Sequence, residues 1–238
     1  MARQSYNHNE RLLRKSSSLA SACKVRHVHY DDNMNSPELR TDQWRPIPQD
    51  VTEQELASVL MAAGIPIQDW AQGSAKTVEH LRVEIEEGES QIDVGINGEI
   101  RRRVSVIWVD VLYPADNGDV YILREDRQVY KDGRVRRRQL STSLGEKMKP
   151  NEEPTAAVER ALHEELGVTA TAGLYTLGAG KKTAHTPDSY PGLKSHFKTY
   201  LYAAVISTEA FVAEGYVEEQ ADKTNYYVWE LNNANANN

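Results

Sequence analysis

Apolar residues recur every three or four positions in two short stretches, which predicts two helices ahead of the main body of the chain. In the first stretch Thr52 and Glu55 form a capping box, so we expect a helix that begins at Glu53 and stops near Gly64. The second stretch has a valine, a leucine and an isoleucine at helical spacing and predicts a helix capped by Ser74. Together they predict a small helical module.

After these helices the pattern changes to β-rich segments separated by dipeptides that favour turns. Three such pairs predict tight hairpins: Asn97-Gly98, Asn117-Gly118 and Asp132-Gly133. One strongly marked helix is predicted over residues 154–166. Strands are predicted at residues 90–96, 99–113 and 120–130, from residue 168 onward, at about 195–206 and at 225–230. A mixed sheet with one internal helix is typical of an α+β or α/β sandwich fold.

The two ends of the chain have no apolar periodicity. The sequence therefore predicts a flexible tail over residues 1–49, a helical pair over 50–89, a main domain over 90–231 and a disordered tail over 232–238. The first thirty residues carry six basic residues against one acid, Glu10. That composition fits either an organellar transit peptide or a disordered basic tail.

The overall charge narrows the classes of partner. A formal net charge of −7 gives no general basic field that would draw the chain to nucleic acid or an anionic membrane, so nucleic-acid contact would need a local basic patch. No apolar run approaches the roughly 20 residues of a spanning helix. The single cysteine, Cys23, excludes an intramolecular disulfide, and we expect an intracellular, most simply cytoplasmic, location. The oligomeric state stays open.

The segment from Gly145 to Val168 carries the candidate chemistry. At about 100° per residue, Val158, Leu162 and Leu166 share one side of the predicted helix and form its apolar stripe. On this geometry Glu165 flanks the stripe and Glu164 lies well outside it. Two neighbouring carboxylates beside a glycine-containing loop can hold a hard divalent cation. They are equally typical of an ordinary helix with a solvated face and a glycine cap.

The spacing within this segment resembles the Nudix box, which is written G-x5-E-x7-R-E-U-x-E-E-x-G-U with U an aliphatic residue. The matching positions are Glu152, Arg160, Leu162, Glu164, Glu165, Gly167 and Val168. The resemblance covers about two dozen residues in detail. It implies a Nudix-like α/β/α sandwich with a mixed sheet, preceded by the small helical module.

The resemblance also implies a function and a set of site residues. Glu164 and Glu165 become ligands of Mg²⁺ or Mn²⁺ bridging the diphosphate of a substrate, and Glu152 becomes the acidic partner of Arg160. The metal would neutralise phosphate charge and activate a water molecule. Gly167 would end the helix so that the chain returns to the sheet.

The segment departs from the family pattern at two positions. Gly145 stands seven positions before Glu152 where the family has six, a one-residue insertion that a loop can absorb. Ala161 replaces the first glutamate of the family's Arg-Glu pair, at what the wheel gives as the centre of the acidic face. Glu218 or Glu219, later in the chain, could supply a further metal ligand. The alternative is that these two acids belong to an acidic surface turn.

Further candidates for substrate contact lie outside the box. Arg134, Arg136 and Arg138 would share one face of a strand and could bind phosphate, or they could be a solvated sheet edge. A long loop is expected from 178 to 192, and Lys182 and Tyr190 in it could capture the substrate, with the tyrosine stacking on a base.

Two hypotheses follow from this sequence. The first is a Nudix-type hydrolase that cleaves a diphosphate bond in a nucleoside diphosphate derivative with a divalent metal. The second is a catalytically impaired Nudix-fold module that binds a nucleotide or a protein partner, since Ala161 can neither bind metal nor act as a base.

Overall fold

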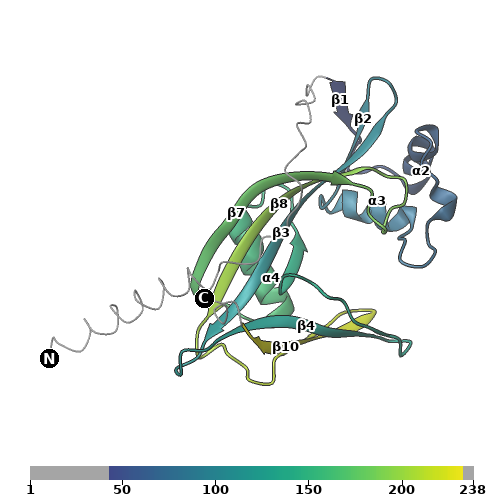
Figure 1. Ribbon diagram of the computed structural model, residues 1–238. Helices are drawn as coiled ribbons and strands as arrows, with labels where there is room; N and C mark the ends of the chain where they lie inside the picture. The colour runs from purple at the N-terminus through teal and green to yellow at the C-terminus, as the bar shows by residue number, and fades with distance from the viewer. Residues whose placement is uncertain (1–42, 233–238) are drawn as a thin grey trace.

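The structure is a computed structural model that describes residues 43–232 (Figure 1). The expectations for residues 1–42, including the transit peptide, and for residues 233–238 lie outside this part of the chain. The elements in chain order are β1 (Trp44–Pro46), α2 (Glu53–Ala62), η2 (Ile67–Asp69), α3 (Val78–Glu86), β2 (Gln91–Gly95), β3 (Ile100–Pro114), β4 (Val120–Tyr130), β5 (Val135–Arg136), β6 (Leu144–Lys147), α4 (Pro154–Leu166), β7 (Thr171–His185), β8 (Ser195–Ile206), β9 (Tyr216–Glu219) and β10 (Lys223–Leu231).

The long strand β3 organises the sheet. It pairs antiparallel with β2, β6 and β4 along different parts of its length, and parallel with β8. β7 extends the sheet beyond β8, while β10 and β9 extend it beyond β4. In Figure 1 the β3, β7 and β8 strands form one arm and β4 with β10 forms a second, diverging arm. The sheet is therefore mixed, and the architecture is the α+β class expected from the sequence.

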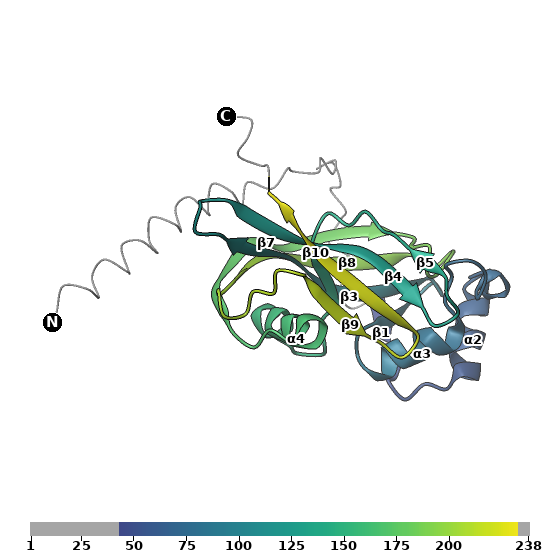
Figure 2. The ribbon, with the colours of Figure 1, turned by 90° about the horizontal axis from the view of Figure 1, so that it is seen from below.

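Helices lie on both faces of β3. Ile107 and Val109 belong to the same buried cluster as Val158 and Leu162 of α4. Arg102, at an alternate position of the strand, instead contacts Glu84 of α3. Because successive strand residues point to opposite faces, α4 and α3 cover opposite sides of β3. Figure 2 shows α4 beside β9 and α3 at the far end of the sheet.

The helical pair of α2 and α3 has its own apolar cluster, but other segments contribute to it. The cluster joins Leu56 and Leu60 of α2 with Leu81 of α3, and it also contains Tyr190 and Leu193 from the connection between β7 and β8. None of the helices in residues 43–232 is both long enough and apolar enough to cross a membrane.

Helix α2 begins where the sequence predicts, whereas α3 begins later than predicted. The Thr52 hydroxyl accepts the backbone N–H of Glu55, whose carboxylate accepts the Thr52 N–H in return. The second helix is capped by Thr77 rather than Ser74. His80, three residues after Thr77, accepts the N–H of Thr77 through Nδ1, and a reciprocal capping bond involving histidine is not part of the usual Ser/Thr and Glu/Gln pattern.

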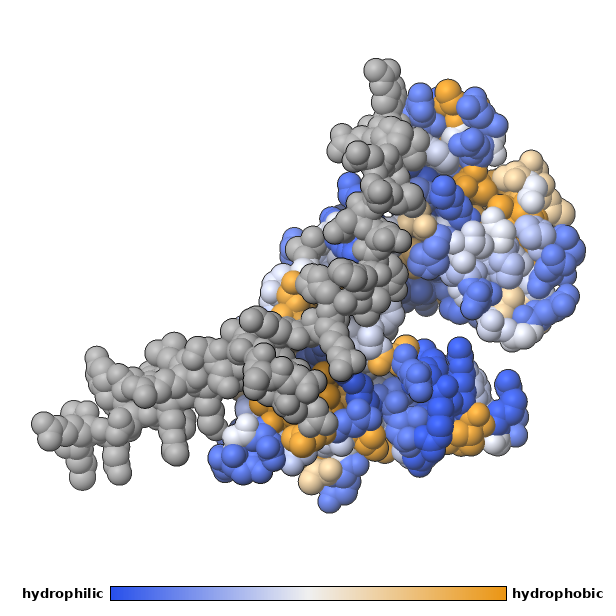
Figure 3. All heavy atoms as spheres, in the orientation of Figure 1, coloured by the Kyte–Doolittle hydropathy of each residue, from blue (hydrophilic) through white to orange (hydrophobic). Residues whose placement is uncertain are grey.

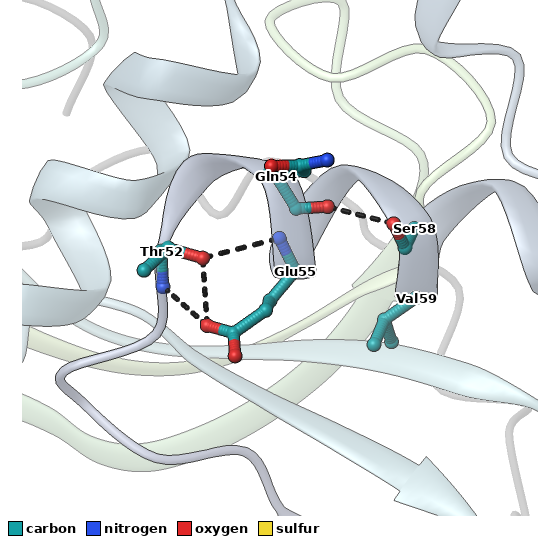
Figure 4. Close-up of a pocket in the computed structure, with 5 residues that line it drawn as sticks. All are labelled: Thr52, Gln54, Glu55, Ser58 and Val59. Atoms are coloured by element: carbon teal, nitrogen blue, oxygen red, sulfur yellow. Dashed lines mark hydrogen bonds between the residues drawn. The ribbon is translucent and has the colours of Figure 1, made fainter.

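Replacing Thr52 with alanine should lower the free energy of unfolding by about 1 kcal/mol, because the cap of α2 is lost. Figure 4 shows these contacts and the shallow pocket around them. Urea denaturation measures the change. Ser58→Ala is the control on the same helix. The Ser58 hydroxyl donates to the carbonyl of Gln54, one turn earlier, and does not cap the end of the helix. Equal losses in the two variants would contradict the capping role.

Several strands, including β6, differ from the sequence-based expectation. Trp44–Pro46 form β1 inside the segment expected to be a tail, because this stretch pairs with β2 and the Trp44 ring lies 4.1 Å beneath the guanidinium of Arg101. β7 continues to His185 through the segment expected to be a loop, and register shifts near Gly178 accommodate its glycines. β9 occupies part of the expected acidic turn. In each case pairing with another strand overrides the local composition.

Candidate functional site

Arg160 of α4 gathers the segment that precedes the helix. Its Nε donates to Glu152 Oε1 at 2.8 Å and its Nη2 to the backbone carbonyl of Lys147 at 2.9 Å. Its Nη1 donates to Glu164 Oε2 at 3.1 Å, one helical turn away. Hydrogen bonds to Glu152 and the other acids hold the pKa of Arg160 above its usual range, so it stays charged. The expected contact between Glu152 and Arg160 is present, and Arg160 also fixes the rotamer of Glu164.

The ends of α4 match the sequence. Pro154 occupies the first turn, and Gly167 caps the C-terminus with φ 68°, in the left-handed region that suits glycine. Gly145 lies under the ring of Trp108, where a β-carbon would stand 2.1 Å from a ring atom. Glycine is therefore required at Gly167 by the helix end and at Gly145 by the close approach of Trp108.

The two neighbouring glutamates of α4 have different surroundings. Glu164 is exposed, whereas Glu165 turns toward the sheet and accepts a hydrogen bond from the Tyr227 hydroxyl at 2.7 Å. The sequence places Glu165 on the flank of the apolar stripe of α4, and in the structure it is only partly exposed. Ala157 and Ala161 are fully buried and widen the apolar stripe of α4, which places Glu165 within it. Ala161 is a core residue and not the centre of an exposed acidic face.

The charges of several other carboxylates act on Glu165. Burial raises the pKa of Glu165 to about 8, and although the Tyr227 hydroxyl favours the charged form, the negative charges of Glu218, Glu146 and Glu125 oppose it. A cation bound among these acids would favour the charged form and compete with the proton. Acids on β4, β6 and β9 therefore make the surroundings of Glu165 unfavourable for further negative charge.

The raised pKa predicts a pH dependence of folding in EDTA. An acid whose pKa rises from 4.5 to about 8 on folding binds more protons when folded. Stability from this group is therefore full below pH 4.5 and falls as the pH rises through 8, by no more than about 1.4 kcal/mol per pH unit for one proton.

Urea denaturation between pH 5.5 and 9 measures this slope against Glu165→Gln, which carries no titrating group at that position. As the pH rises, the unfolding free energy of wild type should fall relative to that of the variant. A constant difference across this range would show that Glu165 titrates normally.

Glu146 is a neighbour that the sequence analysis missed. It lies on β6 opposite Ile107, on the α4 side of the sheet, and its Oε1 is 3.8 Å from Arg160 Nη1. Burial raises the pKa of Glu146, and the positive charge of Arg160 offsets this rise only in part. Leu144 and Met148, two positions to either side, are both buried. That alternation is the signal that could have placed Glu146 inside.

Glu218 and Glu219 point to opposite sides of β9. Glu218 pairs in register with Asn225 of β10, whose Nδ2 donates to Glu218 Oε2 at 2.6 Å. Its charge also contributes to the raised pKa of Glu165. Glu219 is exposed at the alternate position. Of the two acids expected as further metal ligands, only Glu218 lies near Glu165.

A comparison of the sequence with protein-family models places this chain in a family. The family model described as NUDIX domain matches residues 102–226, more than half of the chain. The chain belongs to the Nudix family. Its Nudix helix is α4, and the matched range extends from β3 into β10. A search of curated proteins found no match.

Solved structures similar to this Nudix chain are distant from it. An Ap4A hydrolase of C. elegans is 13% identical, with 52% of this chain and 77% of that chain covered and a TM-score of 0.31. The NUDIX domain of Shewanella oneidensis NrtR, solved with ADP ribose, is 14% identical over 54% and 73%, with a TM-score of 0.30. The M. smegmatis Nudix hydrolase RenU is 16% identical over 60% and 80%, with a TM-score of 0.32. Such distant likenesses do not identify a substrate.

The Nudix site contains carboxylates that could bind a metal ion, but they are not gathered around one point. Among residues 43–232, no three His, Cys, Asp or Glu side chains stand close enough together to hold a metal ion as they are placed. The carboxylates of Glu146, Glu165 and Glu218 are nevertheless hard oxygen donors that repel one another. This donor set fits Mg²⁺ or Mn²⁺ better than a softer metal.

The basic candidates lie in different places. Arg134 and Arg136 are exposed, and Arg134 pairs with Asp132 in its own turn. Arg138 reaches inward, where its Nε donates to Glu125 Oε1 at 2.9 Å. Lys182 is exposed on β7, not in a loop. Only Arg138 thus contacts one of the carboxylates near Glu165.

Tyr190 does not have the place expected of a base-stacking residue. Its side chain is fully buried in the cluster of α2 and α3, 5.1 Å from the ring of Trp70 and 4.9 Å from the guanidinium carbon of Arg102. The glycine and proline residues around it do form a turn, but that turn folds inward over the helical pair. Tyr190 therefore stabilises the core and cannot stack on a ligand at the surface.

Proposed function

We propose that this Nudix protein is a hydrolase that cleaves a diphosphate bond in a nucleoside diphosphate derivative. The observation that carries the proposal is the partly buried carboxyl of Glu165, which feels the charges of three further acids and lies next to a glutamate that Arg160 holds in place. Glu164, Glu165, Glu146 and Glu218 would hold Mg²⁺ or Mn²⁺. When bound, the cation would supply neutralisation of phosphate charge and a lowered pKa of a water molecule.

The chain's own residues have distinct parts in this proposal. Tyr227 fixes one oxygen of Glu165 and leaves the other available. Arg160 holds Glu164 and ties it to the preceding loop through the carbonyl of Lys147. Glu146 would contribute the carboxylate that Ala161 cannot supply, from β6 instead of from the helix. The proposed site therefore draws its acids from α4, β6 and β9.

A panel of diphosphate compounds tests the proposal. Purified protein with Mg²⁺ or Mn²⁺ would be incubated with nucleotide sugars, dinucleoside polyphosphates, ADP-ribose and capped RNA, and the products separated by chromatography. We expect at least one compound to yield a nucleoside monophosphate or diphosphate in a metal-dependent reaction. Glu159→Gln, an exposed residue of the same helix, should leave the rate unchanged.

The second candidate is a Nudix module that binds without turnover. The fully buried Ala161 favours it, because α4 lacks one acid of the family pattern. Binding of a diphosphate compound by calorimetry, with no product from any member of the panel, would decide for the module and against the hydrolase.

A further inference from the structure

We propose that Gln128 and Asn225 form a subsite that binds neutral hydrogen-bond donors at the nucleoside end of the substrate. The inference rests on the proposed function and adds to it which part of the substrate the β4 and β10 strands contact. The donors in question are sugar hydroxyls or base amino groups, which share the chemistry of an uncharged N–H or O–H.

The two amides lie side by side on the α4 side of the sheet. Gln128 of β4 and Asn225 of β10 are direct partners in register, and Asn225 is also opposite Glu218 of β9. Both are nearly fully buried, at 1% and 4% exposure. The next inward positions on the same two strands are Glu125 and Tyr227, so the pair continues the face that reaches Glu165.

Both amides have an oxygen without a partner. Gln128 Nε2 donates to Glu125 Oε2 at 3.2 Å, and Asn225 Nδ2 donates to Glu218 Oε2 at 2.6 Å. Gln128 Oε1 and Asn225 Oδ1 are buried and accept no hydrogen bond among the described residues. Turning either amide over would set its oxygen against a carboxylate, so the two acids fix the orientation.

Two unpaired acceptors at neighbouring positions indicate a ligand. A buried polar group without a partner is uncommon in a folded protein and destabilises it, and here two are retained together. An amide oxygen can only accept, so the group that satisfies it must donate. A fully ionised phosphate has no proton to donate, and Glu125 and Glu218 would repel it. The occupant is therefore an uncharged, donor-bearing part of the substrate.

The position suits the nucleoside end of a molecule whose diphosphate lies at Glu165. Asn225 and Tyr227 are two residues apart on β10, about 7 Å along a strand, a step that one nucleotide can span. Tyr227 contacts Glu165 directly. The same strand would thus set the separation between the cleaved bond and the donor group.

The groups next to the two amides reach the surface. Arg138, which pairs with Glu125, and Glu218, which accepts from Asn225, are both only partly buried. Residues 137–143, between β5 and β6, have no regular secondary structure and include Arg138. In Figure 3 the surface is hollowed between the helical pair and the β4 and β10 part, and the wall on the β4 side is strongly hydrophilic.

Calorimetry in Mg²⁺ with non-hydrolysable ligands tests the inference. The probes are α,β-methylene-ADP, its 2′-deoxy and inosine counterparts, and methylenediphosphonate, which has no nucleoside. Gln128→Met removes the free oxygen in a side chain of similar shape. It should weaken α,β-methylene-ADP about tenfold, leave methylenediphosphonate within twofold, and melt no lower than wild type. The exposed Gln139→Met is the matched control and should change neither affinity.

The counterparts identify the donor in the wild-type protein. Weaker binding of the 2′-deoxy compound points to the ribose hydroxyl, and weaker binding of the inosine compound points to the base amino group. If Gln128→Met weakens both ligands equally or neither, or if wild type gains nothing from the nucleoside, the inference is wrong while the proposed function stands. If neither α,β-methylene-ADP nor methylenediphosphonate binds in Mg²⁺, it is the proposed function that fails.

Discussion

Glu165→Gln should reduce kcat/KM of the hydrolysis about a thousandfold while leaving the protein at least as stable as wild type at pH 8. Glutamine keeps the shape of the side chain and its contact with the Tyr227 hydroxyl, but it cannot carry the charge that a divalent cation needs. A metal ion contributes several kcal/mol to transition-state stabilisation, and about 4 kcal/mol corresponds to a factor of a thousand. Stability should not fall, because the charged form of Glu165 is disfavoured in the fold.

The measurement is a steady-state assay on whichever compound the panel identifies, together with urea denaturation at the same pH. Glu159→Gln on the exposed side of α4 is the control for a lost helical carboxylate. Tyr227→Phe, which removes only the hydroxyl that orients Glu165, should lower kcat about tenfold with a smaller change in KM. Activity of Glu165→Gln within tenfold of wild type would exclude this carboxylate from the chemistry.

Glu84→Leu should lower the free energy of unfolding by about 3–5 kcal/mol, the largest loss of stability that we expect from one substitution. Glu84 is buried on α3, where its Oε2 accepts from Arg102 Nη2 at 2.6 Å and from Ser90 Oγ at 2.8 Å. Its Oε1 is 2.7 Å from the ammonium groups of Lys76 and Lys147. Removing it leaves the guanidinium of Arg102, 4% exposed, without a carboxylate.

The charges around Glu84 also set the direction of a pH effect. Burial opposes its charge, but Arg102, Lys147 and Lys76 outweigh burial and hold the pKa of Glu84 well below its usual range. The stability from Glu84 is therefore fully present above the unfolded pKa near 4.5 and is lost as the pH falls below it. This is opposite in sign to the effect of Glu165.

Urea denaturation at pH 7 and pH 4 separates these contributions. Glu86→Leu, at an exposed position of the same helix that pairs only with Arg82, is the control and should leave the unfolding free energy nearly unchanged. Arg102→Leu should cost less than Glu84→Leu, because the two lysines still neutralise Glu84. A similar loss for Glu84→Leu and Glu86→Leu would show that the buried pair does not anchor α3 to the sheet.

Short-range chemistry let the sequence predict several elements closely. The capping box at Thr52, the span of α4 from Pro154 to Leu166 and its glycine cap all depend on residues within one helical turn of each other. The three turn dipeptides separate paired strands as expected, because positive φ is a local property of glycine. The contact between Glu152 and Arg160 could also be predicted, because the spacing of the box fixes the position of both residues relative to α4.

Strand pairing could not be predicted from local composition. β1 depends on its pairing with β2 and the length of β7 on its pairing with β8, so tail-like and loop-like composition misled the prediction. Tyr190 looked like a surface residue of a glycine-rich loop, but that loop closes the apolar cluster of the helical pair.

The sequence by itself determined the family, the helix that carries its acids and the arginine that holds one of them. Only the tertiary structure decided that Glu165 is partly buried against Tyr227, that Ala161 belongs to the core and that the charges of Glu146 and Glu218 act on Glu165 from two other strands. A helical wheel gives the angle of each side chain but not how far the sheet wraps around the helix. The burial and the charge of these acids are therefore properties of the assembled sheet.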